Sequence, residues 1–188
     1  VLILHINTKY CHALTGPAGS TLLVSIGKKN FQPLDEAFRV EFSYHAATTT
    51  SEYFNVGLSA KKGPLGTSDY RLLLEAVSVP GGKTFLHLTY SYAFDFSGWL
   101  AMQGYLATIG SGKVGFTTAD PQPGSPPSPI GGVRGVVERN TMRYYLAIDA
   151  YLGALSAPPA DQLEKRLQNW FTSTERYPRQ LREVDRST

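Results

Sequence analysis

Apolar and polar side chains alternate along much of the first half of the chain. In residues 85–94 (FLHLTYSYAF), the larger apolar groups fall on one side and His87, Thr89 and Ser91 fall on the other. Alternation with a period of two is typical of a strand with one buried face. The same pattern predicts strands over residues 1–8, 21–28, 39–46, 52–60, 70–79 and 85–94, with a further short one over 113–117.

Short turns between these stretches favour an antiparallel meander. Residues 61–69 (KKGPLGTSD) and 79–83 (VPGGK) carry the glycines and prolines of tight connections. Successive antiparallel strands can be joined by such turns, whereas parallel strands need a long crossover. We therefore expect a curved antiparallel sheet of about six or seven strands, covered on one side.

The periodicity changes after Phe96 to spacings of three and four, which predicts a short helix that Ser97 caps and Gly110 ends. A longer helix is predicted over 134–155. Arg139 and Arg143 fall opposite its apolar stripe, where we expect them to be solvated. The stripe of the long helix consists of Val137, Thr141, Tyr144, Tyr145, Ile148, Tyr151, Leu152 and Leu155.

A Pro/Gly/Ser-rich loop over 119–132 precedes the long helix, and a second helix follows it. Asp161 and Glu164 have the spacing of a capping box for that second helix, whose apolar side includes Trp170 and Phe171. The predicted class is α+β: residues 1–156 form a domain in which the sheet grips the long C-terminal helix, and residues 157–188 form a helical extension packed on or beside it.

The composition of the chain excludes several classes of protein and several kinds of site. The chain has 188 residues, of which 42% are hydrophobic and 18% charged, and a net charge of +3, so it is globular rather than disordered. Its lysines and arginines form no concentrated stripe, so we expect no nucleic-acid partner. A single cysteine, Cys11, excludes an internal disulfide and a multi-cysteine metal site, and we expect its thiol to be buried. No run of 18 apolar residues exists, so we expect no transmembrane segment.

The tyrosine-bearing face of the sheet is the best candidate for a function. One amphipathic helix cannot fill a large concave sheet, so we expect a cavity between sheet and helix, lined by hydrocarbon and a few hydroxyls as ligand pockets are. The alternative is that the tyrosines only fill the core. The candidate ligand-binding residues are Phe42, Tyr44, Leu72, Leu74, Leu88, Tyr90, Tyr92, Tyr145 and Ile148.

The sequence offers no catalytic or metal-binding signature. His45 and His87 lie on the polar sides of their strands and could approach each other only if those strands were neighbours; a zinc site would need more ligands. The segment 110–115 (GSGKVG) lacks the spacing of a phosphate-binding loop. We therefore predict no catalytic residue, no metal ligand and no cofactor, and leave open whether the chain is an enzyme.

Four segments resemble a family of uncharacterised bacterial proteins of the START-like, or SRPBCC, superfamily: GPLGTSDYRLLLEA, KTFLHLTYSYAF, YLATIGSGKVGFT and GVRGVVERNTMRYYLAIDAYL. The resemblance implies a helix-grip fold with a tunnel for an apolar ligand. It also implies a periplasmic or otherwise exported protein, although the chain carries no signal peptide. START-like domains open with a strand and two short helices, which either were removed ahead of Val1 or are missing because the resemblance is imperfect.

These observations leave three hypotheses. The first is a module that binds an apolar or amphiphilic small molecule, such as a lipid or isoprenoid, between sheet and helix. The second is a cyclase or hydrolase-type enzyme that uses the same cavity with a tyrosine or histidine as acid and base. The third is a cell-envelope interaction protein that docks through an exposed patch around Trp170 and Phe171.

Overall fold

A computed structural model describes residues 4–16, 19–119 and 126–183. Over these residues the fold is α+β, with a six-stranded antiparallel open sheet and three α-helices. It forms two compact units: a sheet unit, Ile6–Ala101, and a helical unit, Val1–His5 with Met102–Thr188. The domain boundary predicted at residue 156 stays a prediction.

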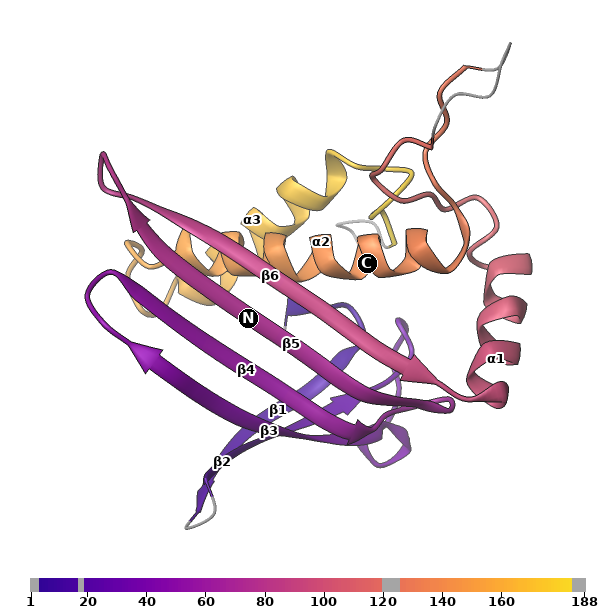
Figure 1. The fold of residues 1–188 in the computed structure, drawn as a ribbon, viewed down its shortest axis with the longest axis horizontal. Coiled ribbons are helices and arrows are strands. Elements are labelled where there is room, and N and C mark those ends of the chain that lie inside the picture. The colour runs from indigo at the N-terminus through magenta and orange to yellow at the C-terminus, as the bar shows by residue number, and fades with distance from the viewer. Residues whose placement is uncertain (1–3, 17–18, 120–125, 184–188) are drawn as a thin grey trace. The chain divides into compact units, whose positions relative to one another are not determined.

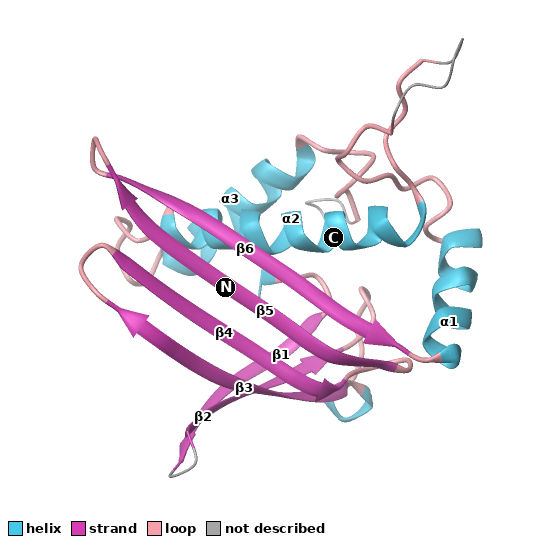
Figure 2. Ribbon diagram, viewed as in Figure 1, coloured by secondary structure: helices cyan, strands magenta, loops and turns pink. Residues whose placement is uncertain are grey.

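The sheet unit is a meander in which every strand pairs with its neighbours in sequence, in the order β1-β2-β3-β4-β5-β6 (Figure 1). The strands twist steadily, so that β1 and β2 cross the direction of β5 and β6 (Figure 2). This confirms the predicted antiparallel sheet and its number of strands. The strands are β1 Thr8–Gly16, β2 Gly19–Ile26, β3 Phe38–Thr49, β4 Tyr53–Lys62, β5 Thr67–Val79 and β6 Lys83–Phe94, and a 3₁₀ turn, Leu34–Glu36, precedes β3.

Two predicted strands are wrong. Residues 4–7, expected at the end of a first strand, lie outside the sheet, and β1 starts at Thr8. The apolar run there packs with the helical unit instead: Leu4 is buried, and the ring of His5 stacks on Tyr144 with centroids 5.1 Å apart. Residues 113–117 form a loop, in which the backbone N–H of Gly115 bonds to Ile130. A short apolar run does not by itself distinguish a strand from a buried segment.

Glycines shape two of the turns. Gly81 and Gly82 have φ of 85° and 68°, which suits the tight β5–β6 hairpin that the sequence predicts. Gly66, between β4 and β5, has φ of 72°, and a Cβ there would lie 2.3 Å from Oδ1 of Asp95 and 2.7 Å from the backbone N of Gly98. The β4–β5 turn therefore packs directly against the segment that follows β6.

The first helix, α1, spans Phe96–Ala107 and crosses the boundary between the two units. Its capping residue is Asp95 rather than the predicted Ser97. Oδ1 of Asp95 accepts the backbone N–H of Gly98 at 2.9 Å and the hydroxyl of Ser97 at 2.7 Å. These two hydrogen bonds lower the pKa of the Asp95 carboxyl.

In the helical unit, α2 (Gly132–Leu152) packs on α3 (Gln162–Glu175). Between them, the Arg166 guanidinium lies 4.0 Å from the centroid of the Tyr151 ring. Figure 1 shows the two helices side by side. The predicted long helix is confirmed, although it ends at Leu152. The buried apolar residues of the unit are Leu4, Leu146, Ala147, Ile148, Ala150, Ala154, Trp170 and Leu181.

Two expectations about these helices are wrong. Arg139 and Arg143, expected in solvent, are 1% and 6% exposed. Both lie among partners that are distant in sequence, which helical periodicity does not reveal. Asp161 makes no side-chain capping bond, and the oxygen of Glu164 accepts from Gln168 instead, so the capping box does not form.

Within the described residues, no helix combines the length and the apolar character needed to cross a membrane. The Pro/Gly/Ser-rich loop predicted over 119–132 falls partly outside those residues, at 120–125. In its described part, Pro129 forms an isolated antiparallel bridge with Thr118, which directly precedes the loop.

Candidate functional site

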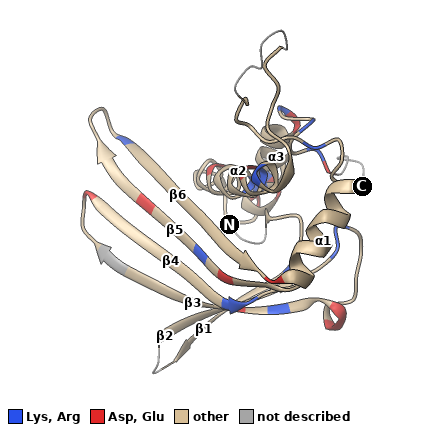
Figure 3. Ribbon diagram, turned by 45° about the vertical axis from the view of Figure 1, so that its right-hand side comes forward, with Lys and Arg blue, Asp and Glu red and all other residues tan. Residues whose placement is uncertain are grey.

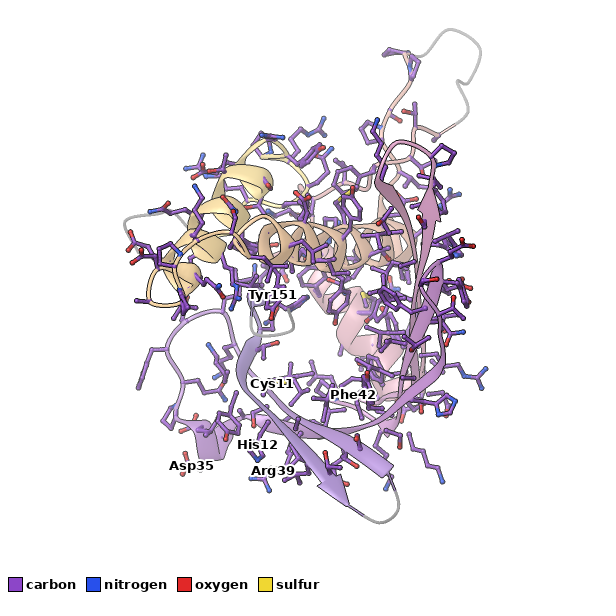
Figure 4. The ribbon with its side chains drawn as sticks, turned by 90° about the vertical axis from the view of Figure 1, so that its left-hand side faces the viewer. Cys11, His12, Asp35, Arg39, Phe42 and Tyr151 are labelled. Carbon is purple, nitrogen blue, oxygen red and sulfur yellow. The ribbon has the colours of Figure 1, made fainter. Side chains whose placement is uncertain are left out.

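The strand register sorts the sheet into an apolar face and a polar face. In β1 and β3, Cys11 and Phe42 lie on one face, while His12 and Arg39 lie on the other (Figure 4). The same alternation continues to β6 through the antiparallel pairs of β3–β6, apart from register shifts between Ala46 and Thr48 and between Ser68 and Arg71. This register shows which of the predicted ligand-binding residues lie on the same face of the sheet.

Seven of the nine predicted ligand-binding residues share the apolar face. Tyr44 pairs with Leu58, Leu58 with Leu72, and Leu72 with Tyr90, which makes one row across four strands. The next row joins Val56, Leu74 and Leu88. Neighbouring strands lie about 4.8 Å apart, so side chains along a row contact each other. The seven are Phe42, Tyr44, Leu72, Leu74, Leu88, Tyr90 and Tyr92.

An aromatic cluster forms one end of this face, and its centre is Tyr70, which the sequence analysis did not select. The Tyr70 ring stacks on Tyr92 with centroids 5.5 Å apart and meets Phe42 edge-on at 6.1 Å. Tyr92 also approaches Tyr90 at 5.6 Å. Tyr70 lies two residues before Leu72 and pairs with Ala60, so simple alternation already places it on this face. The register shift between Ser68 and Arg71 affects only its pairing with β6.

The hydroxyls of this cluster differ in their partners. The Tyr70 hydroxyl donates to Oγ1 of Thr67 at 2.7 Å, so it is satisfied within its own strand. In the part of the chain that the structure describes, the hydroxyls of Tyr44 and Tyr92 make no hydrogen bond. Burial raises the pKa of Tyr70, and burial with the neighbouring Tyr70 raises that of Tyr92. Both phenols therefore stay protonated at neutral pH and can donate hydrogen bonds.

The charged and imidazole groups of the central strands lie on the opposite face. There Glu75 accepts from the Tyr53 hydroxyl at 2.9 Å and lies 2.9 Å from Nδ1 of His87. These contacts lower the pKa of Glu75, chiefly through the His87 bond. His45 lies on β3, and two strands separate β3 from β6, which is about 14 Å at ordinary strand spacing, so the two histidines do not meet.

No group of three or more metal-ligating side chains occurs among the residues described. Cys11 is a free, half-buried thiol on the apolar face, where the sequence led us to expect a buried one. Burial raises its pKa, which keeps it in the unreactive thiol form.

The remaining two predicted site residues belong to the helical unit. On α2, Ile148 is buried and Tyr145 is 45% exposed. Of the two residues around which a docking patch was expected, Trp170 is buried and packs edge-on against the half-buried Phe171 at 5.2 Å.

Comparison of the chain with models of protein families, with curated proteins and with solved structures finds no match.

Proposed function

We propose that the apolar face of the sheet binds an apolar or amphiphilic small molecule of lipid or isoprenoid kind. The observation that carries the proposal is a hydrocarbon-and-hydroxyl face that runs across β3–β6 and is incompletely covered. Tyr44 and Phe54 on this face keep 38% and 37% of their surface exposed. Covering apolar surface stabilises a complex by about 25 cal/mol per Å².

The tyrosines give the ligand a preferred orientation. The hydroxyls of Tyr44 and Tyr92 can donate to a carboxylate, hydroxyl or carbonyl at one end of the ligand, while Leu72, Leu74 and Leu88 contact its chain. A few placed polar groups in an otherwise apolar lining are typical of small-molecule sites. A helix-grip arrangement and an exported location, which the START-like resemblance implies, would suit such a ligand and form part of this proposal.

The chemistry of the face supports binding more than catalysis. A general acid or base needs a pKa near the working pH. Here the phenols of Tyr70 and Tyr92 have raised pKa values, and the imidazoles of His45 and His87 lie on the other face. No observation favours a cyclase or hydrolase over a binding module.

The test is titration of delipidated protein with a fluorescent fatty acid. Leu88→Arg puts a charge on the apolar face, and we expect it to weaken binding at least tenfold. Thr89→Arg is the matched control, because Thr89 is the next residue of the same strand and lies exposed on the polar face; we expect it to bind like the wild type.

A second variant covers the case in which Leu88→Arg does not fold. Tyr92→Phe keeps the ring and removes one hydroxyl, and we expect it to weaken binding of a fatty acid more than binding of the matching hydrocarbon. Absence of saturable binding to the wild type, or equal losses in Leu88→Arg and Thr89→Arg, would overturn the proposal.

A further inference from the structure

Arg139 is a buried arginine with most of its hydrogen-bonding capacity unused. Its side chain is 1% exposed, and Nη2 donates to the Tyr105 hydroxyl at 3.1 Å. Nε and Nη1 are both inaccessible to solvent and find no acceptor within the described ranges. Those two nitrogens carry three of the five N–H groups of a guanidinium.

Among the described residues, a second buried cation lies near Arg139. One helical turn later on α2, Arg143 is also buried, and it bonds to Glu183 and to Oδ1 of Asn140 at 3.2 Å. Nζ of Lys113 lies 3.8 Å from the same Glu183 carboxylate. Two described cations, Arg143 and Lys113, therefore already share the Glu183 carboxylate.

The nearest acid on α2 is already engaged. Oε2 of Glu138 accepts the backbone N–H groups of Phe116 and Thr117 at 2.7 and 2.9 Å, and its Oε1 pairs with Arg134 at 3.0 Å. His5, an electrostatic neighbour of Arg143, stacks on Tyr144 and carries no negative charge in either of its ordinary states.

A guanidinium cannot lose its proton in a protein, so Arg139 stays charged when buried. A buried charge is stable only when it is paired and its hydrogen bonds are satisfied. We propose that Arg139 is the anchor of a buried anion site, which takes a small carboxylate or a phosphate on its unused N–H groups. A planar fork of N–H donors matches the oxygens of either anion.

The Arg139 guanidinium lies close to the backbone of Gly135. Nη1 lies 3.6 Å from the position that a Cβ at Gly135 would take, and the same position lies 3.2 Å from the backbone N of Gly115. Because both unpaired nitrogens are covered, an anion reaches them only after a local shift of these neighbours.

The experiment follows the Nε–H signal of Arg139 in ¹H–¹⁵N spectra of the full chain, assigned by its loss in Arg139→Lys. The protein is titrated separately with inorganic phosphate and with acetate, against sodium chloride at equal ionic strength. We expect a saturable shift of this signal and a rise in the thermal unfolding midpoint, with one of the two anions or both, that sodium chloride does not reproduce.

Two variants test whether the anion-dependent rise in the unfolding midpoint depends on Arg139. Arg139→Met should lose the anion-dependent rise in the midpoint. Arg134→Met, on the exposed side of the same helix, should keep it. A response to phosphate alone assigns a tetrahedral oxyanion, and a response to acetate alone assigns a carboxylate.

Two results would overturn the site: a wild-type Nε–H signal that neither anion moves, or an Arg139→Met midpoint that rises as much as that of the wild type. If Arg139→Met does not fold, the wild-type spectrum still decides the matter. The sheet has no part in these measurements, so their outcome is independent of the fatty-acid titration.

Discussion

The two units of this chain are stabilised over very different distances in sequence. In the sheet unit, each strand pairs with the strand that comes next in the sequence, and β6 follows β5 after three residues. In the helical unit, His5 stacks on Tyr144, and Lys113 bonds to the backbone oxygen of Arg182. Local patterns therefore determine the sheet, whereas the helical unit depends on contacts between distant residues.

The units also differ in where they place charge. Charged side chains of the sheet lie on its polar face or at strand ends; β6 carries only one, Lys83, at its start (Figure 3). The helical unit buries two arginines and a glutamate. A buried ion pair is sensitive to the loss of either partner, since the other charge is then left unpaired in a low-dielectric surrounding.

The largest effect expected is from Glu183→Gln. The change keeps the shape of the side chain but leaves Arg143 without its charged partner, and we expect the free energy of unfolding to fall by about 3–5 kcal/mol. Denaturant titration of the helical transition measures it. Glu164→Gln is the control, because that carboxylate is exposed and accepts only from Gln168; a comparable loss there would contradict the comparison.

Gly66→Ala should be the most damaging small change in the sheet unit. A left-handed φ costs an alanine about 1–2 kcal/mol, and overlap with Asp95 and Gly98 adds about 1–3 kcal/mol. Gly81→Ala has a similar φ of 85° but nothing within 4 Å of the new Cβ, so it should show the backbone cost alone. Equal losses in the two variants, measured by thermal unfolding, would show that the packing against Asp95 contributes nothing.

Mild acid should weaken the helical unit through His5. Burial, and secondarily the charge of Arg143, lower its pKa to about 4, against a partial opposing effect of Glu183. The unfolded chain binds a proton near pH 6.5 and the folded chain does not, so stability is full above pH 6.5 and falls as the pH drops toward 4. Between pH 7.5 and 5.0 this amounts to about 2 kcal/mol.

Urea titrations at the two pH values test the contribution of His5. His5→Gln should remove most of the pH dependence in this range, whereas His12→Gln, which changes an exposed side chain of β1, should leave it intact. Retention of the full dependence in His5→Gln would assign it to another group.

The smallest effect concerns the tyrosine hydroxyls of the sheet. Tyr70→Phe removes the hydrogen bond to Thr67 and should cost about 1 kcal/mol. Tyr44→Phe removes a half-exposed hydroxyl that has no partner in the described chain, and its effect on unfolding should be under about 0.5 kcal/mol. A larger loss in Tyr44→Phe would show that its hydroxyl already has a structural role.

The sheet could be predicted because successive residues of a strand point to opposite faces, so period-two alternation shows directly on which face each residue lies. Every strand from β2 to β6 lies where its pattern indicates, and Phe42, Leu72 and Tyr90 share the face expected of them. Tyr70 follows the same alternation, two residues before Leu72, so its face could also have been predicted. The alternation does not show the bulge between Ser68 and Arg71, where Asp69 adopts a φ of 49°.

The helical unit was less predictable for a physical reason. Periodicity shows which residues share one side of a helix, but it does not show whether a second layer covers the other side. Arg139 and Arg143 lie opposite the expected apolar stripe, yet Tyr105 and Glu183, which are 34 and 40 residues away, are their partners. Pairings at such separations cannot be inferred from one sequence.

The helical unit is built from two pieces of chain, Val1–His5 and Met102–Thr188, with the whole sheet inserted between them. A meander has contacts of short range and can form as soon as its hairpins are synthesised. His5 precedes the sheet in the chain, whereas Arg143 and Glu183, whose charges act on it, follow the sheet. The sheet can therefore form during synthesis before the partners of His5 in the helical unit have been made.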